Sequence, residues 1–379
     1  MNSFLEYYGE HQISPVAQDI SDLALHYRKR EKLYRQLGMP PRLFQNADIL
    51  EVGPGSGYNT LAFFAWGGNV HLVEPNPAGR RDMKQLFCER QVLENKYEIY
   101  ETTIEEFQSE QRYDIIIAEG FLHSIDNAKS IIQKLKSKII RGGVIVVTCM
   151  DEMSMFVEQM KRLICHYMIS DIEEYEEQVA FCTRLFEPQF SNLDGMSRKV
   201  EDWVRDDMLN PAFNNEVILD LSEAIQTFGE DFYVLGSSQK IFTDYSWYKD
   251  LSYRENENCI AQFAQKQHTF FMTGIKESKL NEYEHCFLKQ QISAIRSKCI
   301  VFEKTGVDVI NDVLDLLGSI IHVAASIDLR LLNFINECCE ILERLKQETS
   351  FSLEKYQTFF HAVGRTQQYL SMVKKYEYE

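Results

Sequence analysis

The sequence predicts an α/β protein built on a doubly wound sheet of seven strands. From residue 48 onward, short apolar runs alternate with helix-length amphipathic segments, which is the pattern of parallel strands joined by covering helices. A glycine-rich turn after the first run connects a strand directly to a helix. Five strands are expected in the first part of the sheet, over 45–150, and they lie at 48–52, 70–73, 97–100, 113–118 and 143–148.

Helical patterns fill the intervals between these strands and also precede the sheet. Apolar positions at helical spacing predict a helix over residues 15–37, with Ser14 as N-cap and Pro15 in the first turn. Gly38 and the two prolines after Met39 end it. We therefore expect residues 1–44 to form an N-terminal helical segment that covers the site described below. The helices between the strands are expected at 58–66, 78–89 and 130–138.

Residues 151–228 break the alternation of strands and helices. Charged amphipathic patterns, such as those over 153–166 and 172–186, are typical of surface helices rather than of a parallel sheet. We expect this part of the chain to be a helical insertion that serves as a substrate lid.

Two further parts are expected after the insertion. Residues 229–278 contain β-favouring runs at 232–236 and 269–275, and these predict strands that complete the sheet. Residues 279–379 contain no strand signal and are expected to form a C-terminal helical module. Its helical spacing is clearest at 309–317, 320–332 and 334–345.

Composition and charge disfavour several classes of function. The chain has 379 residues and a net charge of -17, which disfavours a broad nucleic-acid-binding face. The absence of a basic start followed by an apolar run, and of about 18 consecutive apolar residues, favours a cytoplasmic protein without a membrane span. The nine cysteines lack a CxxC pair and the nine histidines lack paired ligand spacing, so we expect reduced thiols and no metal site.

The most specific local feature is the glycine turn within residues 49–59, which read I-L-E-V-G-P-G-S-G-Y-N. Glycines at alternate positions let the backbone turn sharply and let a ligand approach without interference from a Cβ atom. The helix that follows offers unpaired N–H groups at its N-terminus. The pattern alone is also compatible with a tight strand-to-helix connection that binds nothing.

Glu74 adds a second feature, because it ends the next predicted strand about 20 residues beyond the turn. A carboxylate in that place lies beside the glycine loop and accepts hydrogen bonds from two ribose hydroxyls. Glu74 is otherwise a capping or surface carboxylate, and Pro75 a residue that merely ends the strand. Together the turn and Glu74 predict a nucleoside-containing ligand without distinguishing NAD from S-adenosylmethionine.

Five segments in this order and spacing resemble class I S-adenosylmethionine-dependent methyltransferases, whose fold is Rossmann-like. The resemblance covers roughly residues 45–150. A dehydrogenase would more often show G-x-G-x-x-G, which this turn lacks. The segments are E-V-G-P-G-S-G at 51–57, V-E-P-N at 73–76, T-T-I-E-E-F at 102–107, Y-D-I-I-I-A-E-G-F-L-H at 113–123 and R-G-G-V-I-V-V-T at 141–148.

The resemblance implies that S-adenosyl-L-methionine is the cofactor and assigns residues to its parts. The loop glycines would approach its methionine portion, and Glu74 would hold the ribose hydroxyls. The residues after the third strand would flank adenine, and those after the fourth would line the methyl-donor side. The expected cofactor-binding residues are Glu51, Gly53, Gly55, Gly57, Asn59, Glu74, Pro75, Thr103, Ile104, Glu119, Gly120 and Tyr34.

His123 is the expected catalytic base, because it follows the fourth strand and imidazole titrates near neutrality. A buried structural histidine is the alternative. In the N-terminal segment, Arg30 or Tyr34 is a candidate for the cofactor carboxylate. Two segments that combine charge with aromatic rings, 197–211 and 245–249, suit a sugar or another polar organic substrate, or else supply core aromatics of a lid.

The expected function is methyl transfer to a small molecule or saccharide, most simply O-methylation. Segments E-D-W-V-R-D and S-W-Y-K-D are similar to those of uncharacterised bacterial methyltransferases of surface polysaccharide assembly. The C-terminal helices are candidates for a homodimer interface. Two alternatives stay open, a non-catalytic cofactor-binding scaffold that docks a biosynthetic partner through those helices, and an NAD-dependent oxidoreductase.

Overall fold

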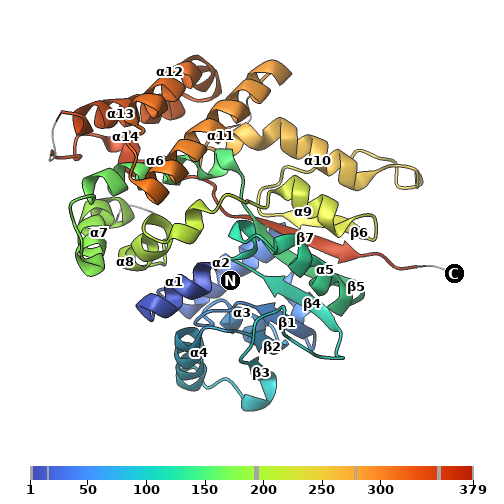
Figure 1. Ribbon diagram of the computed structural model, residues 1–379. Helices are drawn as coiled ribbons and strands as arrows, with labels where there is room; N and C mark the ends of the chain where they lie inside the picture. The colour runs from blue at the N-terminus through green and yellow to red at the C-terminus, as the bar shows by residue number, and fades with distance from the viewer. Residues whose placement is uncertain are drawn as a thin grey trace. The chain divides into compact units, whose positions relative to one another are not determined.

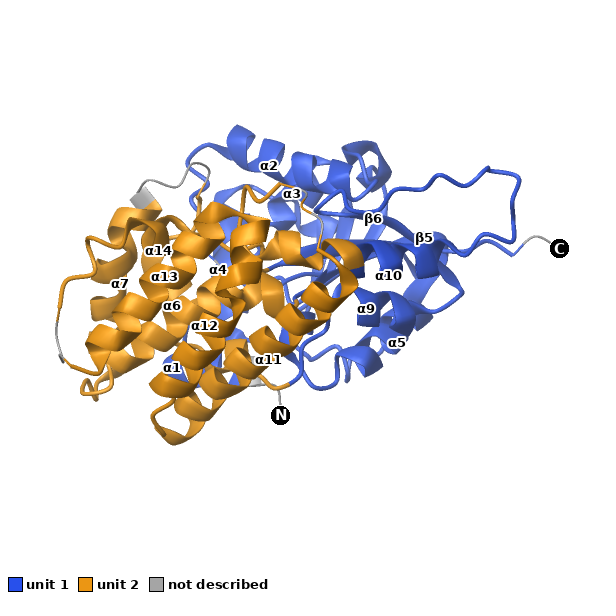
Figure 2. Cartoon of the chain, turned by 90° about the horizontal axis from the view of Figure 1, so that it is seen from above, with its two compact units in different colours: residues 1–150, 217–264, 367–379 blue, residues 151–216, 265–366 orange. Residues whose placement is uncertain are grey.

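The computed structural model divides the chain into two compact units, which are described separately (Figure 2). Unit 1 contains the sheet and unit 2 is helical. Unit 1 consists of residues 1–150, 217–264 and 367–379, and unit 2 of residues 151–216 and 265–366. The structure describes residues 3–14, 17–191, 196–276, 278, 280–347 and 351–377.

Unit 1 is built on a seven-stranded sheet in the order β3-β2-β1-β4-β5-β7-β6 (Figure 1). Strands β1 to β5 are parallel, and β7 runs antiparallel to both β5 and β6. The strand order reverses between β1 and β4, so the loops that follow these two strands diverge and leave a crevice at the carboxyl edge. The strands are β1 (Asp48–Val52), β2 (Asn69–Val73), β3 (Tyr97–Tyr100), β4 (Tyr113–Ala118), β5 (Ile139–Cys149), β6 (Phe232–Ser237) and β7 (Gln368–Lys374).

Helices cover both faces of this sheet because its central strands are apolar on both sides. Ile49 and Ile115 belong to a core that includes side chains of α2 (Leu23–Gln36), α3 (Thr60–Ala65) and α4 (Pro77–Glu89). Successive strand residues point to opposite faces, so the buried Leu50 and Ile116 face the other side. Figure 2 shows α2 and α3 on one side of the sheet and α5 (Ala128–Lys138) and α9 (Leu221–Phe228) on the other.

The prediction of an α/β, doubly wound seven-stranded sheet is confirmed. The five strands expected over residues 48–148 are all present, although β5 is longer than expected. The helices expected at 78–89 and 130–138 correspond to α4 and α5, and that expected at 58–66 is the shorter α3. The strand expected at 232–236 is β6.

The expected strand over residues 269–275 is wrong. Its first residues end the 3-10 helix η6 (Gln267–Phe270), and the next two, Phe271 and Met272, are buried in the core of unit 2. Gly274 then turns the chain at a φ of 80°, a value that a regular strand does not use. The run is therefore apolar because it fills a helical core, and its β-propensity does not decide its structure.

The missing strand is β7 at the C-terminal end, so the expectation that residues 279–379 contain no strand is also wrong. Leu370 and Met372 alternate with Ser371 and Val373, and the strand inserts between β5 and β6. The signal is short and lies between polar residues, which hides it beside the long helices before it. Its partners are distant in the sequence, so only the tertiary fold selects it.

The predicted N-terminal helix is shorter than expected. It begins at Leu23, because Asp22 accepts a hydrogen bond from the backbone N–H of Leu25 and so caps the helix. Residues 17–22 are not helical, and Asp19 instead accepts a hydrogen bond from the Ser21 N–H in a tight turn. The predicted start at Pro15 lies outside the described residues. A separate helix, α1 (Ser3–His11), precedes this turn.

Unit 2 forms a helical core of its own from two distant parts of the chain. The expected helical insertion ends earlier than residue 228, because α9 packs against α5 in unit 1 and Lys129 pairs with Glu223. Within unit 2, Arg162 is fully buried and forms a two-pronged ion pair with Glu303 at 2.7 Å. The helices of unit 2 are α6 (Glu152–Met168), α7 (Tyr175–Ser191), α8 (Val200–Trp203), α11 (Glu282–Thr305), α12 (Ile310–Ile327), α13 (Leu329–Leu345) and α14 (Gln357–His361), and a further helix, α10 (Glu255–Lys266), crosses the boundary between the units.

Within the described part of the chain, α12 alone is long and apolar enough to cross a membrane by length and composition. Its apolar side chains, including Val313, Leu317 and Ile320, are buried in the core of unit 2. A soluble core helix passes the same test, so α12 is weak evidence for a membrane span.

Candidate active site

The loop after β1 adopts the sharp turn that its glycines predict. Gly53 and Gly55 have φ values of 67° and 56°, in the left-handed region that favours glycine. A Cβ atom on Gly53 would lie 3.2 Å from the ring of Phe121. Gly79 at the start of α4 is equally constrained, because its Cβ would lie 3.1 Å from the carbonyl oxygen of Gly55. The loop backbone is therefore packed closely between the ring of Phe121 and Gly79 of α4, and it carries no side chain at Gly53 or Gly55.

Glu74 lies directly beside this loop, at the carboxyl end of β2. One carboxylate oxygen accepts a hydrogen bond from the Gly55 N–H and the other from the Asn76 N–H, each at 2.8 Å. Burial raises the pKa of Glu74, and the two N–H groups act in the opposite direction. Each carboxylate oxygen has a second lone pair, so Glu74 can anchor the loop and still accept from two hydroxyls of a ligand.

A pocket of about 380 Å³ opens over the loop and Glu74. Eight of the twelve predicted cofactor-binding residues lie on its wall, and they come from the ends of β1, β2, β3 and β4. The volume is in the range of small-molecule sites. The eight are Gly53, Gly55, Glu74, Pro75, Thr103, Ile104, Glu119 and Gly120.

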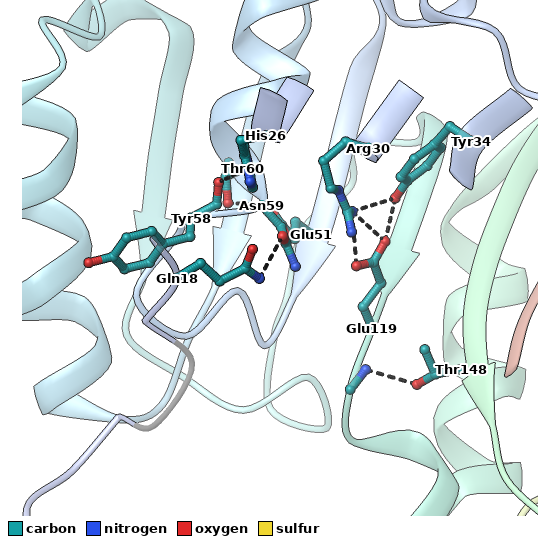
Figure 3. A network of polar contacts seen from close by, with 11 residues as sticks. Gln18, His26, Arg30, Tyr34, Glu51, Tyr58, Asn59, Thr60, Glu119 and Thr148 are labelled. Atoms are coloured by element: carbon teal, nitrogen blue, oxygen red, sulfur yellow. Dashed lines mark hydrogen bonds and ion pairs between the residues drawn. The ribbon is translucent and has the colours of Figure 1, made fainter. Parts of the chain in front are cut away.

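Glu119 follows β4 on the pocket wall and is held there by two residues of α2 (Figure 3). A single Arg30 nitrogen, Nη2, lies 2.8 and 2.9 Å from its two oxygens, and the Tyr34 hydroxyl donates to one of them at 2.5 Å. Burial and the Glu119 charge raise the pKa of Tyr34 well above its usual range. Burial by itself would lower the pKa of Arg30, but Glu119, Tyr34 and Tyr369 raise it overall. Arg30 is therefore a permanent cation behind the pocket wall.

The other four predicted cofactor residues lie behind the wall rather than on it. Tyr34 acts on the pocket through Glu119, and Glu51 accepts a hydrogen bond from the Thr60 hydroxyl at 2.7 Å. A Cβ atom on Gly57 would lie 2.7 Å from Met83, so this glycine allows α4 to pack closely. Asn59 accepts a hydrogen bond from Gln18 at 3.2 Å. These residues support the loop, and nothing in the pocket geometry gives them direct contact with a ligand.

His123 is 3% exposed and does not line the pocket. Its Nδ1 lies 3.4 Å from the Thr148 hydroxyl, which also accepts a hydrogen bond from the Gly120 N–H at 2.8 Å. Its backbone carbonyl accepts from the Leu219 N–H. His123 therefore supports the turn after β4, and a role as catalytic base stays a prediction.

The N-terminal segment contributes three residues to the pocket wall. Leu5 and Tyr8 of α1 and Ser14 lie on the wall. The Ser56 hydroxyl donates to that of Ser14 at 2.9 Å, and the Asn76 side chain donates to the Ile13 carbonyl at 3.1 Å. These contacts attach the segment to the glycine loop and to the start of α4.

Sequence reasoning missed several residues of the wall, most importantly Phe121 and Asn76. Both lie inside the segments that carry the resemblance, directly after Gly120 and Pro75. Their positions beside assigned residues were the available signal.

Glu105 and Glu106 also line the wall, and no Lys or Arg of the described residues does. The pocket wall is therefore acidic, which suits a ligand that carries positive charge.

The two aromatic segments differ in burial. Trp203 packs against Phe186 and Phe190 in unit 2, with ring centroids 5.1 and 4.8 Å apart, so it is a partly buried aromatic at the edge of that core. Tyr245 and Tyr248 are 90% and 81% exposed in the loop before α10, so the alternative of core aromatics is wrong for that segment. The Lys249 ammonium lies 5.5 Å from the Tyr248 ring centre.

The nine cysteines are free thiols, and no group of three or more metal-ligating side chains occurs within the described ranges.

Comparison with known proteins agrees with this geometry. Residues 24–181 match a family described as Methyltransferase domain. This match spans the glycine loop, Glu74 and Glu119. The matched region is therefore similar to a methyltransferase domain. S-adenosylmethionine is the cofactor of such a domain, and the pocket fits it, because Glu74 offers two acceptors for ribose hydroxyls and the glycine loop offers bare backbone.

Individual relatives of this methyltransferase domain are distant. Ubiquinone biosynthesis O-methyltransferase of Rickettsia felis is 25% identical over 140 residues, which are 36% of this chain and 50% of that protein. The chain thus spans about half the length of this curated relative. PKMT2 from Rickettsia typhi is 16% identical, covers 63% of this chain and 49% of its own, and has a TM-score of 0.41. The N-methyltransferase NodS from Bradyrhizobium japonicum is 15% identical, with coverages of 38% and 74% and a TM-score of 0.31.

Proposed function

We propose that the protein is an S-adenosylmethionine-dependent methyltransferase that acts on a small molecule or a saccharide. The observation that carries the proposal is the position of Glu74. Its carboxylate faces the pocket while both oxygens hold the backbone around the glycine loop. When bound, the cofactor supplies an electrophilic methyl group on a sulfonium. The chain's own residues align the acceptor for in-line attack and exclude water.

The placement of the cofactor follows the order of the strands. Glu74 holds the ribose, Thr103 and Ile104 flank the adenine, and Gly53 with Glu119 meets the methionine end. The acceptor approaches beside Gly120 and Phe121, which lie at the same end of the wall. This proposed placement lies along the carboxyl edge of the sheet, where ligands of doubly wound folds bind.

O-methylation is the proposed reaction, with His123 as the base that receives the hydroxyl proton. Its burial means that the turn after β4 must move for the imidazole to reach an acceptor. The test is His123→Asn. A loss of kcat together with unchanged affinity for S-adenosylhomocysteine supports the base. A lower unfolding temperature with kcat retained would assign His123 a structural role.

A saccharide acceptor, in a pathway of surface polysaccharide assembly, is the finer form of the proposal. The exposed rings of Tyr245, Trp247 and Tyr248 support it, because flat aromatic surfaces stack on sugars and these rings are 65% exposed or more.

The C-terminal helices are proposed to form the interface of a homodimer. The cytoplasm is the proposed location, in keeping with the reduced thiols.

The deciding experiment has two parts. Calorimetry measures binding of S-adenosylhomocysteine and of NAD to the full chain, and labelled S-adenosylmethionine is then offered with a panel of glycans and metabolites. Saturable binding and transfer of label support the enzyme. Binding without transfer to any acceptor favours the scaffold alternative. Tight binding of NAD alone would replace the methyltransferase by an oxidoreductase.

A further inference from the structure

A second pocket, of about 350 Å³, lies in unit 1 at the end of β6. Its wall is made by the last four residues of β6, the loop that follows them, the start of α10 and Gln36 of α2. Both β5 and β6 run antiparallel to β7, so β6 ends at the same edge of the sheet as the parallel strands β1 to β5. The second pocket therefore also lies at the carboxyl edge, and it shares no wall residue with the pocket over the glycine loop.

The polar side chains of the second pocket offer both donors and acceptors of hydrogen bonds. No described residue forms a hydrogen bond or an ion pair with the side chains of Gln36, Lys240 or Glu255, so these three are available to a ligand. Asp244 accepts from the Ser246 N–H at 2.7 Å and has further acceptor positions. Lys240 thus supplies donors, the two carboxylates supply acceptors, and the Gln36 amide supplies both.

This combination of groups selects a class of ligand. The carboxylates of Asp244 and Glu255 repel a phosphate or another anion, and the Lys240 ammonium repels an organic cation. An apolar ligand would remove these groups from water without giving them partners. A sugar hydroxyl both donates and accepts, so a neutral sugar can satisfy the charged groups of either sign.

The free edge of β6 does not favour a peptide here. β6 is the last strand of the sheet, and an exposed edge strand can pair with a peptide as an added strand. The side chain of Asn256 on α10 already accepts from the Val234 N–H at 3.3 Å and donates to the Phe232 carbonyl at 2.8 Å. These contacts occupy backbone groups that an added strand would use, so they disfavour strand addition beside the pocket.

An exposed aromatic segment borders the second pocket. Asp244 and Tyr253 both lie on its wall, so residues 244–253 begin and end there. Trp247 follows Asp244 by three residues, which places their Cα atoms at most about 11 Å apart. Its ring is 65% exposed. A polar cavity with flat rings beside it suits a sugar, whose hydroxyls form hydrogen bonds while its apolar face stacks on a ring.

Helix α2 connects the two pockets. Arg30 holds Glu119 on the wall of the first pocket, and Gln36 lies on the wall of the second. These two residues of α2 are six positions apart, which is about 9 Å along the helix axis. This separation suits an acceptor of several sugar units, one of which is held apart from the unit that receives the methyl group.

We propose that the second pocket is a saccharide-binding subsite, which holds one sugar unit of the acceptor while another unit receives the methyl group. This inference rests on the proposed function, because it takes the acceptor to be a saccharide of more than one unit. The polar side chains of the pocket select the sugar, and the rings beside it add stacking area.

Saturation-transfer difference NMR of the full chain tests the subsite without knowledge of the acceptor. The probes are the methyl glycosides of glucose, galactose, mannose, rhamnose and N-acetylglucosamine. A single sugar unit in such a pocket should bind with a Kd of roughly 1 to 10 mM. The Kd should stay the same when S-adenosylhomocysteine is saturating, because the two pockets share no wall residue.

Two variants locate the bound sugar. Lys240→Met and Asn258→Leu each remove a hydrogen-bonding group from the wall, and each should weaken sugar binding by roughly 3- to 10-fold with the affinity for S-adenosylhomocysteine unchanged. Lys289→Met, which changes an exposed lysine on α11 of unit 2, is the matched control and should bind sugar as the wild type does. Lys240 is exposed, so its variant should fold even if Asn258→Leu, which loses a contact with the Thr243 carbonyl, does not.

Three results would overturn the inference. They are the absence of binding by every probe, displacement of the bound sugar by S-adenosylhomocysteine, and an unchanged sugar Kd in folded Lys240→Met. Each of these leaves the cofactor site intact. Failure of the wild type to bind S-adenosylhomocysteine is a separate result, which contradicts the proposed function and with it the role of the bound sugar as part of a methyl acceptor.

Discussion

Replacing Glu74 by glutamine tests the link between the glycine loop and the cofactor. The change preserves the size of the side chain but turns one carboxylate oxygen into an NH₂ group. That group cannot accept the hydrogen bond that Gly55 or Asn76 now donates at 2.8 Å, nor one from a ribose hydroxyl. The substitution also removes the charge that strengthens every hydrogen bond to this residue.

The expected loss follows from ordinary hydrogen-bond energies. A hydrogen bond to a charged group contributes about 1.5 to 3 kcal/mol and one between neutral groups about 0.5 to 1.5 kcal/mol. Losing one ribose acceptor and weakening the other removes about 2 to 3 kcal/mol of binding free energy, which is roughly a 30- to 150-fold weaker Kd. The unfolding free energy should change by only about 1 kcal/mol, because relief of a buried charge offsets the lost backbone acceptor.

The assay is calorimetric titration with S-adenosylhomocysteine, which avoids any need to know the methyl acceptor. Glu101→Gln is the control, because this exposed carboxylate ends the next strand and pairs with Arg80 and Lys84. An unchanged Kd for a folded Glu74→Gln protein would refute the assignment of the ribose site. Thermal unfolding of the same samples separates lost binding from lost structure.

Three further changes test the supporting residues. Because the pKa of Glu51 is about 8 when folded and near 4.5 when unfolded, the folded state binds the extra proton between these values and loses stability as pH rises. Between pH 5 and 7, the unfolding free energy of Glu51→Gln should therefore fall by up to about 3 kcal/mol less than that of the wild type, as measured by urea unfolding. Arg30→Met should lower the unfolding free energy by about 3 to 5 kcal/mol, because it leaves Glu119 buried without its cation. Adding Glu119→Gln should restore part of this loss. A single variant as stable as the wild type would contradict the ion pair. Trp247→Ala should leave unfolding and cofactor affinity unchanged, because the ring is 65% exposed, and should raise KM for a saccharide acceptor; an unaltered KM would remove this loop from acceptor binding.

The structure places the predicted site residues in two groups with different physical roles. Those at the ends of strands reach the pocket, because the carboxyl ends of parallel strands meet at one edge of the sheet. Gly57 and Asn59 lie one turn further along the chain, where the backbone has already turned toward α3 and α4. Spacing alone therefore identified the loop but could not separate the glycines that line the pocket from the one that packs against a helix.

Residues brought together over long distances were harder to predict. Glu119 and Arg30 are 89 residues apart, and their ion pair depends on α2 packing beside β4. The exposed rings of Tyr245 and Tyr248 and the partly buried ring of Trp203 occur in similar charged surroundings in the sequence. Burial separates them, and burial is a property of the neighbours that each ring meets.

The sequence by itself determined the parallel half of the sheet, the glycine turn and the acidic residue beside it. These follow from local physics, since apolar runs of strand length, positive φ at glycine and a carboxylate at a strand end are encoded within about 30 residues. Only the tertiary structure decided that β7 completes the sheet while the apolar run at 269–275 fills a helical core. Both segments are short and apolar, so the partners available to each, and not its own propensity, determined which became a strand.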